Sequence, residues 1–312
     1  MARITIPYAI ADFVEMRERS FYYVDKTDYI SKLEDYKAPV FLRPRRFGKS
    51  LLVSTLACYY DRTKAHRFEE LFGGTWIGNH PTKEHNCYMI IRYDFSKMVM
   101  ADSIEGLAQN FNDLNCSPVE IMVEHNRDLF GDFQFANRGD AAKMLEEVLG
   151  FARSHDLPKV YILIDEYDNF TNQLLTAYND PLYEEVTTND SFLRTFFKVI
   201  KAGIGEGSIR TCFCTGVLPV PDELVDENLR TDINWIRRLT LSLDNAKAML
   251  DALVIDDELP YNVADLAKKL DQRKIFDVRY YPIILFYWGI ITLKDRYSMT
   301  FPNETIRCIC MT

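Results

Sequence analysis

Two groups of residues in this chain have the types and the spacing that binding a phosphorylated ligand requires. The first group lies between a short apolar run at 39–42 and a periodic apolar run that starts at Leu51, a context typical of strand, loop and helix. Its members are Arg43, Pro44, Arg45, Arg46, Phe47, Gly48, Lys49, Ser50 and Leu51. A glycine free to adopt positive φ lets backbone N–H groups converge on phosphates, while the lysine adds charge and the serine hydroxyl suits Mg²⁺. We therefore predict that residues 43–51 bind a nucleotide.

This loop departs from the common pattern G-x-x-x-x-G-K-[ST], because Arg43 occupies the position of the first glycine. Pro44 restricts Arg43 to extended geometry and removes one amide donor. Arg45 and Arg46 could supply positive charge to the phosphates instead. Taken alone, the Gly-Lys-Ser tripeptide could equally be a chance occurrence at the start of a helix. A second motif has to decide.

The second group follows a β-branched apolar run at 159–164 and consists of Asp165 and Glu166. The pattern predicts a buried parallel strand whose carboxyl end lies at a ligand site. There, Asp165 would hold magnesium together with Ser50, and Glu166 would orient or activate the attacking water. An acidic turn in which Asp165 caps a helix is the alternative. Two motifs in the right order and context favour a nucleotide site.

Thr215 ends a further strand expected at 210–216. We predict that it senses the γ-phosphate, lying between phosphate and water; the alternative is a threonine that merely ends a strand. Five strands are expected, at 39–42, 88–95, 159–166, 210–216 and 237–241, and the predicted spatial order is 5-1-4-3-2. The fold class is therefore α/β, a P-loop NTPase parallel sheet with helices on both faces.

Composition limits the classes of partner and compartment. The 312 residues carry a net charge of −9 with a pI near 5.2, which argues against a general binder of nucleic acid or anionic membranes. The seven scattered cysteines form no C-x-x-C pair, so we expect a reduced, cytoplasmic protein. Neither a signal sequence nor an apolar run of membrane-spanning length is found, so no membrane partner is expected.

The remaining sequence predicts two domains, an ATPase core at 1–242 and a C-terminal helical lid or winged-helix-like module at 243–312. The second would contain helices near 245–254, 263–270 and 281–288, followed by a hairpin at 290–301. In the core, we expect Asp25 to cap a helix that runs to about residue 36. We also expect separate helices at 104–115 and 118–126, the second opened by Pro118.

The chain resembles the bacterial AAA-ATPase-like family, whose members often carry a PD-(D/E)XK-type nuclease domain at the C-terminus. The resemblance is carried by residues 23–27, 43–50, 94–96, 164–168, 215–217 and 301–304. Residues 43–50 are its most specific element, and the missing first glycine is a trait of that family. Residues 218–238 resemble the family less, so no arginine finger is carried over. The chain stops at Thr312, where such a nuclease domain would begin, and we assign it no nuclease activity.

These observations together predict a Mg²⁺-dependent ATPase with ATP and Mg²⁺ as its cofactors. The alternative is a nucleotide-regulated switch or scaffold that binds ATP and hydrolyses it negligibly. A third interpretation is a DNA-associated module that acts for a partner nuclease. A homo-oligomer is also left open, because AAA-type sites commonly borrow an arginine from a neighbouring subunit.

Overall fold

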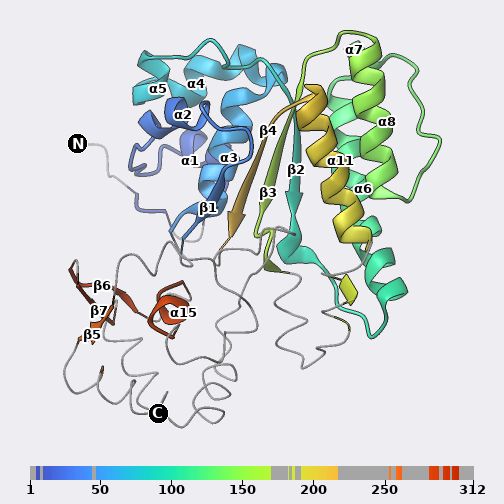
Figure 1. Ribbon diagram of the computed structural model, residues 1–312. Coiled ribbons are helices and arrows are strands. Elements are labelled where there is room, and N and C mark those ends of the chain that lie inside the picture. Colours follow the sequence, from blue (N-terminus) through green and yellow to red (C-terminus); the bar gives the residue numbers. More distant parts are fainter. Residues whose placement is uncertain are drawn as a thin grey trace. The chain divides into compact units, whose positions relative to one another are not determined.

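The computed structural model describes most of the N-terminal two thirds of the chain and shorter pieces beyond (Figure 1). The described residues are 5–7, 10–43, 47–169, 182, 185–186, 191–216, 253, 258–261, 281–287, 291–295 and 297–301. The chain divides into two compact units. The first contains residues 1–41, 48–167 and 181–215, and the second contains 42–47, 168–180 and 216–312.

A four-stranded parallel sheet lies at the centre of the first unit. Its strands are β1 (Val40–Leu42), β2 (Met89–Asp94), β3 (Val160–Asp165) and β4 (Ile209–Gly216), in the order β1-β4-β3-β2. β3 pairs in parallel with β2 and with β4. The N–H groups of Cys212 and Cys214 donate to the carbonyls of Lys37 and Pro39, which extends the parallel direction to β1. The predicted fifth strand at 237–241 lies outside the described residues.

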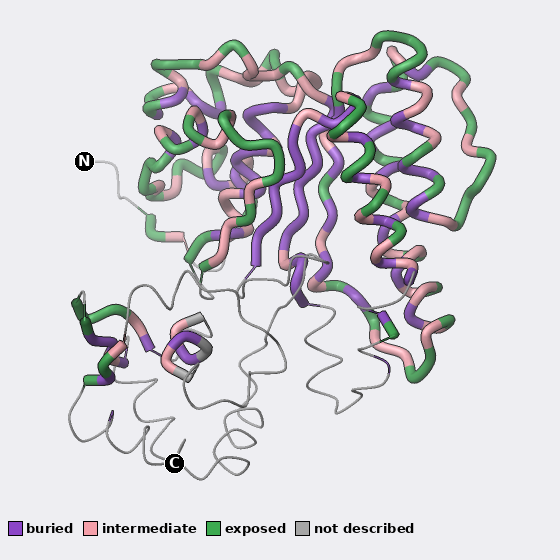
Figure 2. The backbone as a smooth tube through the Cα atoms, in the orientation of Figure 1, coloured by how far each residue is buried: buried purple, intermediate pink, exposed green. Residues whose placement is uncertain are grey.

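β3 is the most deeply buried strand, because all six of its residues are buried (Figure 2). A strand covered on both faces needs apolar side chains throughout, which explains the continuous run before Asp165. On one face, Tyr161 stacks on Tyr60 with ring centroids 4.5 Å apart. On the other, the Tyr93 ring of β2 meets Phe196 edge to face at 5.2 Å.

Helices cover both faces of the sheet, as predicted (Figure 1). α3 (Lys49–Tyr60) packs on β2 and β3 from one side, and α6 (Ile104–His125) packs on β2. α8 (Ala141–Ser154) packs against α6 and against α11 (Phe192–Glu206). The shorter helices of this unit are α1 (Phe13–Glu18), α2 (Asp28–Leu33), η1 (Arg62–Arg67), α4 (Phe68–Phe72), α5 (Trp76–Asn79), η2 (Phe95–Lys97) and α7 (Arg127–Phe130). Among the described residues, no helix has the length and apolar character needed to cross a bilayer.

α6 corrects one prediction, because a single helix of 22 residues replaces the two expected at 104–115 and 118–126. Pro118 lies inside it. A proline there removes one backbone N–H bond and crowds the preceding turn, at a cost of about 3 kcal/mol. Phe111 and Val119 on either side are buried. Burial of this helix face offsets the proline, so helix continuity follows from packing rather than from propensity.

Asp25 also acts differently from the prediction. α2 begins at Asp28, and its N-cap residue Thr27 makes no side-chain capping bond. Asp25 accepts through Oδ1 from the N–H of Thr27 at 2.9 Å and through Oδ2 from the N–H of Trp76, the first residue of α5, at 2.7 Å. Thr27 Oγ1 accepts from the N–H of Ile77 at 3.1 Å. Asp25 therefore bonds both at the start of α2 and at the start of a helix 51 residues further along the chain, and only the first of these was predicted.

The second unit contains a small antiparallel sheet with the order β5-β7-β6. Its strands are β5 (Leu259–Pro260), β6 (Thr292–Leu293) and β7 (Ser298–Thr300), and α15 (Tyr281–Tyr287) lies between β5 and β6 in sequence. Leu293 pairs with Met299, which confirms the predicted hairpin. β5 was not predicted. The helices expected at 245–254 and 263–270 lie almost entirely outside the described residues, so the winged-helix comparison and the boundary at 242 stay predictions.

Candidate nucleotide-binding site

The first predicted motif lies where β1 leads into α3. Gly48 is the N-cap of α3 and has a φ of +76°, in the left-handed region that glycine adopts without strain. Among the described residues, no atom lies within 4 Å of where a Cβ would stand, so the backbone conformation, rather than space, requires glycine. Leu52 donates the first hydrogen bond of the helix, to Gly48 O at 2.9 Å. The N–H groups before Leu52 have no acceptor within the helix, the arrangement that binds anions at helix starts.

Lys49 is the first residue of α3 and is only 6% exposed. A buried ammonium interacts strongly with a nearby negative charge, because water screens it little, so this position suits an anion at the helix start. Ser50 follows it and is half-buried, whereas Leu51 packs against the hydrophobic core. Lys49 and Ser50 are thus placed as predicted at the helix start, while Leu51 has a packing role.

The other residues of the predicted loop lie partly within and partly outside the described part of the chain. Arg43 is exposed, its N–H donates to Gly216 O at 3.1 Å, and its guanidinium donates to Leu42 O at 2.8 Å. Phe47 is 60% exposed. Residues 44–46 lie outside the described part of the chain, so contributions from Pro44, Arg45 and Arg46 stay predictions.

The second motif lies at the carboxyl end of β3. Asp165 is the last residue of that strand and is 4% exposed. Glu166 opens the turn that follows and has a φ of +50°, an uncommon value for a residue with a side chain. Such a conformation costs about 1–3 kcal/mol and persists where surrounding contacts hold it. Here, the N–H of Glu166 donates to Thr215 Oγ1 at 3.3 Å, and that of Tyr167 donates to Thr215 O at 3.0 Å.

Thr215 joins the ends of β3 and β4. Its hydroxyl donates to Asp165 Oδ1 at 2.6 Å, and its side chain is fully buried. The pairing of Ile164 with Cys214 sets this contact, because the next residue on each strand is then Asp165 and Thr215. The structure therefore brings Asp165, Glu166 and Thr215 together through hydrogen bonds. The sequence patterns predicted that Thr215 lies at the same edge as Asp165 but did not predict this hydrogen bond.

The two motifs meet at one edge of the sheet. Parallel strands end on the same side, and α3 begins at that side because it follows β1. Figure 1 shows the start of α3 and the ends of β3 and β4 at this edge. α3 also packs directly against β3. The edge thus carries a helix start with a buried lysine and a strand end with a buried carboxylate.

The oxygens at this edge suit a hard divalent cation. Within the described part of the chain, Asp165 Oδ2 accepts no hydrogen bond, because the Thr215 bond engages Oδ1 alone. Ser50 likewise makes no hydrogen bond through its hydroxyl to a described residue. Magnesium binds carboxylate and hydroxyl oxygens and keeps several waters. These two side chains therefore fit the ion that the motif implies.

Sequence reasoning gave no role to two polar residues that follow this turn. Asp168 and Asn169 are 0% and 1% exposed. Buried polar side chains of this kind usually hold a loop or a ligand. Their signal in the sequence is a polar run immediately after an apolar strand, which alone does not separate a surface turn from a buried one.

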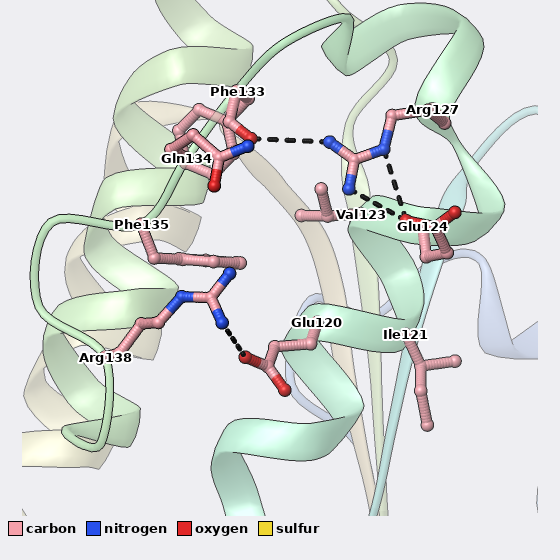
Figure 3. A pocket seen from close by; sticks show the side chains of 9 residues that line it. All are labelled: Glu120, Ile121, Val123, Glu124, Arg127, Phe133, Gln134, Phe135 and Arg138. Carbon is pink, nitrogen blue, oxygen red and sulfur yellow. Dashed lines mark hydrogen bonds and ion pairs between the residues drawn. The ribbon is translucent and has the colours of Figure 1, made fainter.

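A hollow of about 350 Å³ lies elsewhere in the first unit and contains none of the predicted site residues (Figure 3). It is lined by the C-terminal part of α6, by Arg127 and by the segment 133–138. Its two arginines are already paired, Arg127 with Glu124 at 2.8 Å and Arg138 with Glu120 at 3.7 Å. This hollow is therefore not a phosphate site.

A parallel α/β sheet with these two motifs at its carboxyl edge defines a protein of P-loop-like fold. The family model described as "Predicted AAA-ATPase" matches residues 7–225, and the chain belongs to this AAA-ATPase-like family. The matched stretch includes all the predicted site residues.

A relative from Azotobacter chroococcum mcd 1, "Uncharacterized protein in vnfD 5'region", is 29% identical over 230 residues. The alignment covers 70% of this chain and 38% of the relative, so the chain spans well under half of that protein's length. No solved structure matches the chain.

Proposed function

We propose that this protein binds ATP with Mg²⁺ and hydrolyses it. The observation that carries the proposal is the hydrogen-bonded set formed by Asp165, Glu166 and Thr215, at the edge where Lys49 begins α3. Membership of the AAA-ATPase-like family supports nucleotide chemistry at this edge. Lys49, Ser50, Asp165, Glu166 and Thr215 all lie in the first unit, whereas residues 43–47 of the loop belong to the second.

Lys49 and the free N–H groups at the start of α3 would bind the β- and γ-phosphates. Both act on charge, since the helix start contributes a partial positive charge and the ammonium a full one. Ser50 and Asp165 would hold a magnesium ion, which supplies neutralisation of the phosphate charge. Burial of Lys49 and Asp165 strengthens these interactions, because water screens them less.

Glu166 would orient the attacking water and accept its proton. Its carboxylate is carried by a turn that the Thr215 hydroxyl holds through the Glu166 N–H. A general base must be fixed relative to the atom it acts on, and a turn held in an uncommon conformation provides this. Asp165 lies one residue earlier and would serve the metal, so adjacent carboxylates take separate roles.

Thr215 would act on Asp165 first and on the γ-phosphate second. A hydroxyl has one proton, and in this structure it is donated to Asp165. A contact with the γ-phosphate would require that proton to be redirected. We therefore assign Thr215 as a positioning residue for Asp165, with the sensor role dependent on a change when nucleotide binds.

Calorimetric titration with Mg-ATP tests the nucleotide site. Lys49→Ala removes the charge at the helix start and should weaken binding by roughly 2–3 kcal/mol, about 30- to 150-fold in affinity. Lys143→Ala is the matched control, because Lys143 is exposed and pairs with Asp140 on the surface. Equal affinity of the wild type and Lys49→Ala would remove the assignment.

A nucleotide-regulated switch that hydrolyses ATP negligibly is the second candidate. Two observations favour it: the hydroxyl proton of Thr215 is engaged by Asp165, and Arg43 replaces the first loop glycine. Borrowing an arginine from a second copy would complete the site for hydrolysis. Action beside a partner nuclease on DNA remains a separate proposal, which salt-dependent DNA binding would test.

A further inference from the structure

β2 is an edge strand among the described strands, and half of its backbone groups face away from the sheet. In a parallel ladder, alternate residues direct both N–H and C=O to one neighbour. Met89 donates to Lys159 O at 3.1 Å, so Met89, Ile91 and Tyr93 face β3. The backbone groups of Ile90 and Arg92 therefore point to the open side.

The open side is paired only where β2 begins. Tyr88 donates to Tyr60 O and accepts from the N–H of Arg62, each at 3.0 Å. The chain then turns into η1 and leaves the edge. Among the described residues, the backbone groups of Ile90 and Arg92 have no hydrogen-bond partner beyond this point. Unpaired edge groups of this kind are a template for another strand.

A groove of about 720 Å³ runs along the same edge. Ile90, Arg92 and Asp94 line it from β2, Cys58 lines it from α3, and Leu114 and Ile121 line it from α6. Since α3 and α6 lie on opposite faces of the sheet, they form two walls with the strand edge between them (Figure 1). The volume lies within the range of sites that enclose a ligand.

Arg92 carries a positive charge that nothing described neutralises. It is exposed and makes no ion pair or hydrogen bond through its side chain to a described residue. Four carboxylates also line the groove and accept hydrogen bonds from other groups: Asp94 pairs with Lys97 at 3.1 Å, and Asp12, Asp61 and Asp113 accept from the Glu15 N–H, the Thr63 hydroxyl and the Gln109 amide. The two arginines in Figure 3 are likewise paired with glutamates. A carboxylate on a bound segment would therefore supply an ion-pair partner for the Arg92 guanidinium.

We propose that an extended peptide segment of a partner protein binds this groove as a strand added to β2, with an acidic side chain paired to Arg92. Backbone bonds to Ile90 and Arg92 would provide affinity, and the Arg92 charge would select the sequence. A second copy would bring its own walls to the edge, which disfavours pairing of β2 with β2.

A phage-displayed library of random linear nonapeptides is the probe, with selected peptides then synthesised and titrated. The wild type should select peptides with an acidic residue at one fixed position between β-forming residues. Arg92→Ala should weaken the best peptide about tenfold, as expected for loss of a charge-assisted bond. Arg92→Pro should weaken it further, because proline is tolerated on a strand edge but removes the outward N–H. Arg153→Ala on α8 is the control and should bind like the wild type.

Hydrogen exchange identifies the mode of binding. The selected peptide should slow exchange of the Ile90 and Arg92 amides in the wild type and leave the Met89 amide, already bonded to β3, unchanged. Three results would overturn the proposal. The first is that the wild type enriches acidic peptides no more than Arg92→Ala does. The second is peptide binding that leaves the Ile90 amide unprotected. The third is self-association through β2 in place of peptide binding. None of them depends on ATP.

Discussion

The hydroxyl of Thr215 donates a 2.6 Å hydrogen bond to Oδ1 of Asp165, and both side chains are buried. The same hydroxyl accepts from the N–H of Glu166 at 3.3 Å. One side chain at the end of β4 thus holds the carboxylate proposed for the metal and the turn proposed to carry the general base. This is why β4 has to lie next to β3.

We expect Thr215→Val to impair the site and Thr215→Ser to preserve it. Valine keeps the shape but removes the donor, leaving a buried carboxylate oxygen of Asp165 unsatisfied at a cost of about 1–3 kcal/mol. The Mg²⁺ concentration that half-saturates ATP binding should rise for the valine variant and stay near the wild-type value for serine. If Thr215→Val lowers the free energy of unfolding but leaves the Mg²⁺ requirement unchanged, Thr215 supports the fold and not the metal site.

We expect Asp25→Ala to destabilise the protein by about 1 kcal/mol, as for loss of a helix N-cap. Burial alone would raise the pKa of Asp25, but hydrogen bonds from Thr27 and Trp76 and the charge of Arg17 lower it below its ordinary value of 3.8. The lowered pKa means that this stabilisation is present above pH 3.8 and is lost as the pH falls through the folded-state pKa.

Urea unfolding at pH 7 and at stepwise lower pH checks the role of Asp25. Asp28→Ala is the control, since Asp28 starts α2 and pairs with exposed Lys32. A larger loss for Asp28→Ala than for Asp25→Ala would restore α2 as the helix that this segment caps.

For Glu34, we expect a contribution to folding stability with the opposite pH dependence. Its partial burial and the charge of Glu84 raise its pKa above the ordinary 4.5, although hydrogen bonds from Thr82 and Tyr60 and the charge of Arg210 act against this. An acid with a raised folded-state pKa contributes stability that is complete below pH 4.5 and is lost as the pH rises through that pKa.

Glu34→Gln removes the charge and keeps an oxygen that can accept from Thr82 and Tyr60. Relative to the wild type, the variant should therefore be more stable at pH 7 than at pH 4. Chemical unfolding at the two values measures the difference. If the variant and the wild type differ in stability by the same amount at both pH values, or if the order is reversed, the raised pKa of Glu34 is contradicted.

The sequence was most informative where a pattern is local. The buried run before Asp165 predicted β3 closely, and the strand expected at 88–95 is β2. The alignment of β3 beside β4 followed from the expectation that Thr215 and Asp165 share one edge.

Contacts between distant segments were beyond the reach of local patterns. Pro118 suggested a helix start, but packing of the flanking apolar residues keeps α6 continuous. Asp25 caps α5 because folding brings residue 76 to it, which no local spacing reveals. The bond between Thr215 and Asp165 depends on a strand register that side-chain alternation leaves undetermined.

ATP hydrolysis by the wild type and by Glu166→Gln, compared over a range of protein concentrations, tests the proposed activity most directly. Glutamine keeps the shape of Glu166 and removes the base, so turnover should fall ~100-fold or more while ATP affinity is unchanged. The concentration series includes any arginine supplied by a neighbouring copy. Glu146→Gln, at an exposed position of α8, should match the wild type. A wild-type rate no faster than that of Glu166→Gln at every concentration would contradict the ATPase and leave the nucleotide-regulated switch.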